Sequence, residues 1–142
     1  MSEGKNLILL IDDDAICNAI NKIVLNKKFA IEKGCDIEIK AYIEPQKGLK
    51  YLEEVLQTKS YEKIMILLDI NMPVMTGWEF LEEFRKIKNI YNDVVIFILT
   101  SSVNQTDVEM ASEDQNVTGF ITKPLASENA EKLYQLSGCV LG

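Results

Sequence analysis

The chain has 142 residues, of which 47% are hydrophobic and 26% charged, and it contains no histidine. Its length and composition predict a single globular domain, residues 1–142 with a core at about 6–136, that buries roughly 70% of its unfolded surface. The net charge of −7 and the lack of a long Lys/Arg run argue against direct nucleic-acid binding. The lack of histidine excludes His-dependent catalytic triads.

The amino terminus lacks the apolar region of a signal peptide, and no segment approaches the roughly 18 apolar residues that span a membrane. We therefore expect a cytoplasmic protein without membrane contact. The three cysteines, Cys17, Cys35 and Cys139, are widely spaced and form no CxxC motif. This arrangement predicts free, partly buried thiols rather than disulfides or zinc ligands.

The first two expected strands differ in how they are covered. Leu7–Ile11 is apolar throughout and is followed by three aspartates. The next strand, Asp36–Ile43, alternates apolar and polar residues, as expected of an edge strand with one dry side. Between them, four apolar residues at helical spacing predict an amphipathic helix capped by Asp14: Ile16, Ile20, Ile23 and Val24.

The middle of the chain continues the alternation of helices and strands. Pro45 starts a helix whose apolar positions are Leu49, Leu52, Val55 and Leu56. The run Ile64–Leu68 is apolar on both faces and ends on Asp69, which indicates a buried strand whose charge lies in a cleft. A loop with Pro73 and Gly77 leads to a third helix with apolar positions at Phe80, Leu81, Phe84 and Ile87.

The last part of the chain supplies two further strands. The strand Val94–Leu99 is followed by Thr100, and the strand Val117–Thr122 is followed by Lys123 and Pro124. A weak helical pattern covers Asp107–Glu113, and Ser127 is expected to cap a final helix to Leu136. Two edge strands and three buried strands predict an α/β fold: a flavodoxin-like, doubly wound, five-stranded parallel sheet of order 2-1-3-4-5, with helices on both faces.

Polar side chains follow four of the five expected strands. Asp12 and Asp13 come after the first, Asp69 after the third, Thr100 after the fourth and Lys123 after the fifth. Ligand sites in open parallel sheets lie outside the carboxyl ends of the strands, so we expect these groups to converge. This convergence predicts one site at that rim.

Three carboxylates in one pocket need a counter-ion, because two of them about 5 Å apart repel by roughly 3 kcal/mol at an effective dielectric near 20. Oxygen ligands without Cys or His favour Mg²⁺, with Mn²⁺ also possible. A lysine and a hydroxyl opposite such an ion would neutralise a phosphoryl group from two sides. The pattern therefore predicts a phosphoryl-transfer pocket with an aspartate nucleophile.

The segments LLIDDD, LLDINMPVMTG, ILTSS and GFITKP, in this order, resemble the response regulator receiver domains of two-component signalling over nearly the whole chain. The resemblance implies that Asp69 receives a phosphoryl group from a sensor histidine kinase or a histidine phosphotransfer protein. It also implies that Asp13 and Asp69 ligate magnesium directly together with the main-chain carbonyl of Asn71, while Asp12 reaches the ion largely through water.

The resemblance assigns three further roles. Thr100 would bind a phosphoryl oxygen and move inward on phosphorylation, and Lys123 would bind another such oxygen, next to a cis Lys123–Pro124 bond. Phe120 matches the aromatic switch that turns from exposed to buried. The chain departs from compact members of the family by a longer stretch between Asp13 and Asp69, around 26–36. Asn71 and Ser102 occupy positions that resemble the family's tuning sites for phosphoryl lifetime.

Ordinary structural explanations stay open for each residue. Asp12 or Asp13 would serve equally as a helix cap, Thr100 as a loop residue, Lys123 as a solvated turn residue and Phe120 as packing on an edge strand. The evidence for a site lies in their combination.

The leading functional hypothesis is a stand-alone receiver, not an enzyme, whose output is contact with an unknown downstream protein. The fourth helix, fifth strand and last helix form the expected contact face. A phosphatase with an aspartyl-phosphate intermediate is an alternative, although Asn71 stands where such enzymes carry a second aspartate. A receiver fold that acts as an adaptor without phosphorylation is the other alternative.

Overall fold

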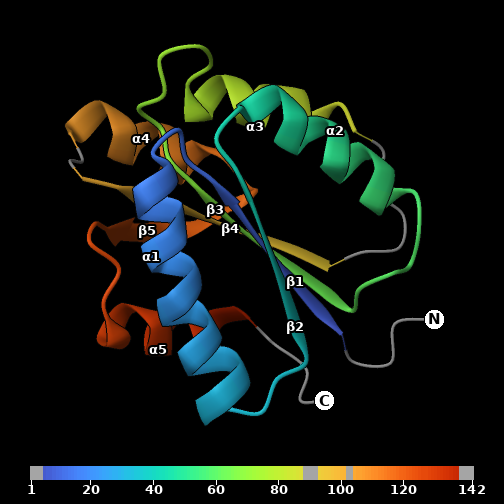
Figure 1. Ribbon diagram of the computed structural model, residues 1–142. Helices are drawn as coiled ribbons and strands as arrows, with labels where there is room; N and C mark the ends of the chain where they lie inside the picture. Colours follow the sequence, from blue (N-terminus) through green and yellow to red (C-terminus); the bar gives the residue numbers. More distant parts are fainter. Residues whose placement is uncertain (1–4, 88–92, 102–103, 138–142) are drawn as a thin grey trace.

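The computed structural model describes residues 5–87, 93–101 and 104–137. Five parallel strands form one sheet in the order β2-β1-β3-β4-β5, as predicted (Figure 1). The strands are β1 (Asn6–Ile11), β2 (Ile37–Tyr42), β3 (Lys63–Leu68), β4 (Asp93–Thr100) and β5 (Val117–Thr122). The helices are α1 (Ala15–Leu25), η1 (Asn26–Glu32), α2 (Pro45–Leu56), α3 (Gly77–Arg85), α4 (Gln105–Glu113) and α5 (Ser127–Ser137).

Helices cover both faces of the sheet. α1 and α5 lie on one face, whereas α2, α3 and α4 lie on the other (Figure 1). Alternate residues of the central strands point to two separate apolar cores, in keeping with the two-residue period of a strand. In β1, for example, Leu9 packs on the α2–α3 side and Ile8 on the α1–α5 side.

The segment between α1 and β2, where the family resemblance suggests extra length, is largely helical. The helix continues from α1 into η1, which has π-helical hydrogen bonding, and then turns at Gly34, whose φ is +73°. Glycine is favoured at this angle because it has no Cβ to clash. η1 packs on α5, and a buried Lys28 pairs with Glu32 and Glu131 there. This segment thus forms ordered structure, and β2 begins one residue after the predicted start.

The first helix buries a different face from the one that its apolar spacing suggests. Ile16, Ile20 and Ile23 are 73%, 51% and 71% exposed, while Asn18 and Asn21 are buried. The Asn18 amide donates to the Asp12 main-chain carbonyl at 2.9 Å, so this buried polar group is hydrogen-bonded to the loop after β1. Asp14 caps the helix, as predicted, by accepting from the amides of Ile16 and Cys17.

The other elements match the sequence expectations with small corrections. β2 is an edge strand, but its apolar side is only partly covered, because Ile37 and Ile39 are half-buried and Ile43 is 51% exposed. α3 ends before Ile87. The prediction of Ser127 as a cap is wrong: Ser127 is the first residue of α5, and the Asn129 side chain accepts from the Ala126 amide.

Two predictions on individual residues reach beyond what the structure describes. Cys139 and Ser102 lie outside the described residues, whereas Cys17 is a free, half-buried thiol and Cys35 is buried. Among residues 5–87, 93–101 and 104–137, no helix is long and apolar enough to cross a membrane.

Candidate functional site

The acidic groups of the site are held at the carboxyl ends of β1 and β3. These neighbouring strands pair in register up to Ile11 and Leu68, so the residues that follow each strand are adjacent. The Asp69 amide donates to the Ile11 carbonyl at 2.9 Å, which extends the pairing one step beyond the strands. Asp12 and Asp69 are therefore fixed by the sheet itself.

The loop after Asp69 is tightly folded against the strand end. The Asn71 amide donates to Asp69 Oδ1 at 3.0 Å, and the Gly77 amide donates to the Ile70 carbonyl at 3.1 Å. A Cβ at Gly77 would lie 2.7 Å from Ile70 Cα and 2.9 Å from the Asp69 carbonyl oxygen, closer than such atoms approach one another. Glycine at this position thus allows α3 to start directly beside the site.

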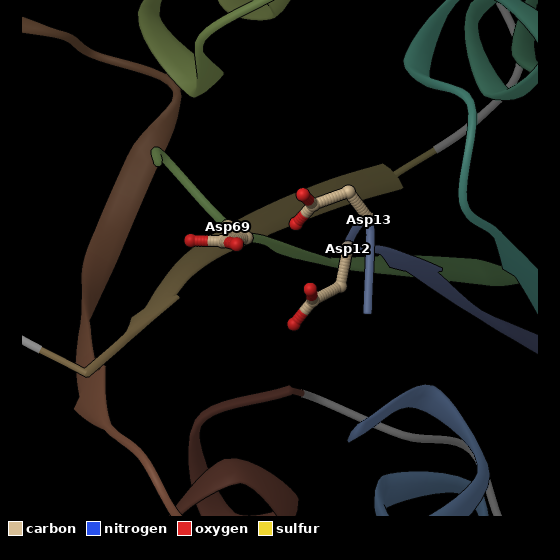
Figure 2. Close-up of side chains that lie close together, drawn as sticks. All are labelled: Asp12, Asp13 and Asp69. Carbon is tan, nitrogen blue, oxygen red and sulfur yellow. The ribbon is translucent and has the colours of Figure 1, made fainter. Parts of the chain in front are cut away.

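Three carboxylates converge at this edge (Figure 2). Asp12, Asp13 and Asp69 each offer an oxygen, and these oxygens all lie within 4.8 Å of one another. Asp12 and Asp69 are 3% and 5% exposed, whereas Asp13 faces solvent. Burial raises the pKa of Asp69, and the charges of Asp12 and Asp13 add to this shift, while the Asn71 amide and Lys123 oppose it.

The counter-charge within the site comes from Lys123. Its Nζ lies 2.6 Å from Asp12 Oδ2 and 3.5 Å from Asp69 Oδ2. Burial lowers the pKa of Lys123, but the hydrogen bond and charge of Asp12 outweigh burial and the net shift is upward. The ammonium group thus stays charged between two carboxylates. The Lys123–Pro124 peptide bond is cis, as the family resemblance implied.

The hydroxyl expected at the site also lies there. Thr100 at the end of β4 is fully buried, and its Oγ1 accepts a hydrogen bond from the Asn71 side-chain amide at 3.1 Å. The Thr100 carbonyl accepts from the Lys123 amide at 2.8 Å, which ties the ends of β4 and β5 together. The groups predicted from four separate strand ends therefore lie at one edge of the sheet.

The comparisons with known proteins agree with this geometry. The family model for the response regulator receiver domain matches residues 8–135. The chain belongs to the receiver domain family of two-component signalling. Among relatives, it is 34% identical over 129 residues to the sensor histidine kinase CheAY of Helicobacter pylori and 37% identical over 125 residues to a protein-glutamate methylesterase/protein-glutamine glutaminase of Treponema denticola.

These alignments cover most of this chain but a small part of each relative. They span 89% and 87% of the receiver, against 14% of the kinase and 30% of the methylesterase. Two solved structures match over nearly their whole length. A two-component response regulator of Cytophaga hutchinsonii aligns with a TM-score of 0.75 and 27% identity over 92% of this chain and 94% of its own. A two-component response regulator of Legionella pneumophila aligns with a TM-score of 0.72 and 29% identity over 91% of this chain and 95% of its own.

The donor set of this receiver fits the divalent cation that receiver domains bind at their acidic pocket. Three carboxylates within 4.8 Å of one another, without sulfur or imidazole ligands, suit Mg²⁺ or Mn²⁺ rather than zinc. Lys123 alone cannot balance three negative charges. The same cluster therefore has both the ligand chemistry and the uncompensated charge that a bound cation requires.

Two contacts around the site, that of Trp78 with Asp107 and that of Cys17 with Asp12, were not predicted from the sequence. The Trp78 ring nitrogen donates to Asp107 Oδ1 at 3.2 Å, which links the start of α3 to the start of α4. Asp107 also closes a capping box with Asn104, a pattern readable from their three-residue spacing.

Cys17 lies close to Asp12, and burial together with that carboxylate raises the pKa of its thiol. Phe120, half-buried on β5, packs at the border of the α2–α3 core.

Proposed function

We propose that this receiver accepts a phosphoryl group on Asp69 and that Asp12, Asp13 and Asn71 complete a magnesium site beside it. The observation that supports this most strongly is the convergence of three carboxylates with Lys123 at one sheet edge. Receiver domains take phosphoryl groups from histidine kinases. The donor for this chain is accordingly a phosphohistidine of a sensor kinase or of a histidine phosphotransfer protein.

The Asp69 carboxylate acts as the nucleophile. One of its oxygens forms the new P–O bond as the P–N bond to the histidine breaks, and the imidazole leaves. A divalent cation held by these carboxylates would supply positive charge against the phosphoryl oxygens. Lys123 and Thr100 lie at the same edge and provide an ammonium group and a hydroxyl for these oxygens. The main-chain carbonyl of Asn71 would hold the cation, while its side-chain amide donates to Thr100 Oγ1.

Thr100 and Phe120 form the switch in this proposal. Thr100 Oγ1 accepts a hydrogen bond from the Asn71 side-chain amide, and its own hydroxyl would donate to an oxygen of a phosphoryl group on Asp69. Movement of Thr100 affects the start of α4 through the short connection between them. The resulting change reaches the face of α4, β5 and α5, where Phe120 shifts toward burial and a downstream protein binds.

The test is intact-mass analysis after incubation with acetyl phosphate and Mg²⁺. We expect one phosphoryl group on the native chain, none on Asp69→Asn, and native labelling on Asp36→Asn, which removes a carboxylate at the opposite end of the sheet. Chelation of Mg²⁺ should abolish labelling. Labelling of Asp69→Asn would place the chemistry elsewhere. Continuous turnover of phosphate esters would favour the phosphatase, and absence of labelling on the native chain would favour the adaptor.

A further inference from the structure

An apolar groove runs between the first helix and the edge strand, on the α1 side of the sheet. It has a volume of about 620 Å³ and is lined chiefly by Ile23, Ile31, Ile37, Ile39, Lys22 and Lys27. A second hollow of about 300 Å³ shares Lys22 and continues along β2 to Ile43. Together they form what we call the α1–β2 groove.

The α1–β2 groove leaves several isoleucine side chains exposed to solvent. Ile23 and Ile31 are 71% and 72% exposed, and Ile43 is 51% exposed. On this face α1 and α5 cover the sheet, whereas α2, α3 and α4 cover the opposite face (Figure 1). α1 and η1 contact β2 on this face, but their cover is incomplete, because Ile37 and Ile39 remain only half-buried. Contiguous exposed apolar surface of this kind marks binding sites for other molecules.

The charge of the α1–β2 groove is opposite to that of the protein. The chain carries 22 acidic against 15 basic residues, yet the residues lining the two hollows include lysines and no carboxylate. Neither Lys22 nor Lys27 has an ion-pair partner within the part of the chain that the structure describes. Nearby lysines do: Lys33 pairs with Glu131, and Lys40 pairs with Glu38. Two unpaired cations beside isoleucines favour an occupant that is apolar with acidic borders.

We propose that the α1–β2 groove binds an amphipathic helix of a partner protein, with an apolar stripe against the isoleucines and Asp or Glu side chains against Lys22 and Lys27. The six residues of β2 give the groove a length of roughly 20 Å, which matches about 13 residues of helix. Its open shape suits a helix lying along it better than a small molecule, which pockets enclose on most sides.

The larger hollow, which holds Ile23, Ile31, Lys22 and Lys27, is separate from the site of phosphoryl transfer, whereas the smaller hollow reaches Asn18 beside Asp12. Ile37 pairs with Asn6 at the amino end of β1, whereas Asp69 follows the carboxyl end of β3. The larger hollow therefore lies toward the end of the sheet opposite the acidic cluster. Binding there and labelling of Asp69 can be measured independently.

The experiment is an NMR titration of the full ¹⁵N-labelled chain with two synthetic helical peptides. One carries leucine along one face and glutamate on both borders, and the other carries lysine in place of glutamate. We expect saturable shifts at residues 22–31 and 37–43 with the glutamate peptide and binding on the order of tenfold weaker with the lysine peptide. The variant Lys22→Glu/Lys27→Glu should reverse this preference.

Surface variants separate docking from folding. Ile23→Ser/Ile31→Ser changes only exposed side chains and should weaken the glutamate peptide at least tenfold, while Ile16→Ser, equally exposed on α1 but outside the groove, should bind as the native chain does. Absence of saturable shifts, shifts centred elsewhere, or equal binding of the two peptides would overturn the proposal. Self-association in sedimentation that Ile23→Ser/Ile31→Ser abolishes would assign the groove to a second copy and also overturn it.

Discussion

Replacing Asp13 by asparagine tests whether the acidic cluster is held together against its own charge. Asp13 has one oxygen within 4.8 Å of oxygens on Asp12 and Asp69. Lys123 pairs with those two carboxylates, so the charge of Asp13 has no cationic partner among the described residues. Without Mg²⁺, the substitution Asp13→Asn should therefore stabilise the fold, although it removes a ligand.

The magnitude follows from distance and exposure. Two unit charges 4.8 Å apart repel by about 3 kcal/mol at an effective dielectric of 20 and by about 1 kcal/mol in water. Asp13 is exposed, so the smaller figure applies. We expect a gain of about 1 kcal/mol in EDTA, or about 3 °C in melting temperature for a domain of this size. A cation at ten times its dissociation constant stabilises the native protein by about 1.4 kcal/mol, and this gain should be lost in the variant.

Thermal melts followed by circular dichroism, in EDTA and in excess MgCl₂, measure both effects. The native chain should respond to Mg²⁺ and Asp13→Asn should not, so the advantage that the variant has in EDTA disappears when Mg²⁺ is added. Asp36→Asn makes the same charge change outside the cluster and serves as the control. A variant that melts below the native chain in EDTA, or that keeps the full response to Mg²⁺, would refute the reasoning.

Three further predictions concern the supports of the site. Gly77→Ala should lower the free energy of unfolding by about 1–3 kcal/mol in urea titrations, because the added Cβ meets backbone atoms. The control is Gly119→Ala, whose Cβ lies 3.7 Å from its nearest neighbour and which should change the free energy of unfolding by less than about 1 kcal/mol. Because the pKa of Asp69 is raised in the folded protein, ionisation of this carboxyl destabilises the fold as pH rises through that pKa. The variant Asp69→Asn does not ionise, so its stability advantage over the native chain in EDTA should grow from pH 4 to pH 7. A constant difference in stability would contradict this prediction. Trp78→Phe should cost about 1 kcal/mol in urea titrations followed by circular dichroism through loss of its hydrogen bond to Asp107, and an unchanged midpoint would show that the α3–α4 link carries no stability.

The site was predictable because a topological rule places it. Once Ile64–Leu68 is recognised as a strand buried on both faces, the residue after it must lie at a sheet end. Parallel strands bring their carboxyl ends to the same edge. Asp12, Asp69, Thr100 and Lys123 needed no side-chain detail to be grouped, and the structure brings them together. The roles of these residues in catalysis and switching remain proposals.

Contacts between helices were not predictable in the same way. The link from Trp78 to Asp107 depends on how the starts of α3 and α4 approach each other, which neither segment specifies alone. The π-helical η1 also has no periodic signature that distinguishes it from a loop of similar composition. Its position is set by packing of Phe29 into the core and by the Lys28 ion pairs with Glu32 and Glu131.

The orientation of α1 shows how function and stability compete within one helix. Turning Ile16, Ile20 and Ile23 inward would gain roughly 1.5–3 kcal/mol for each side chain that became fully buried. It would also withdraw the Asn18 amide from the Asp12 carbonyl and so release the loop that carries the acidic cluster. The observed helix buries its asparagines, which fixes Asp12 beside Lys123, and leaves its isoleucines at the surface. The same rotation of α1 thus holds the acidic pocket in place and exposes Ile23, which lines the α1–β2 groove.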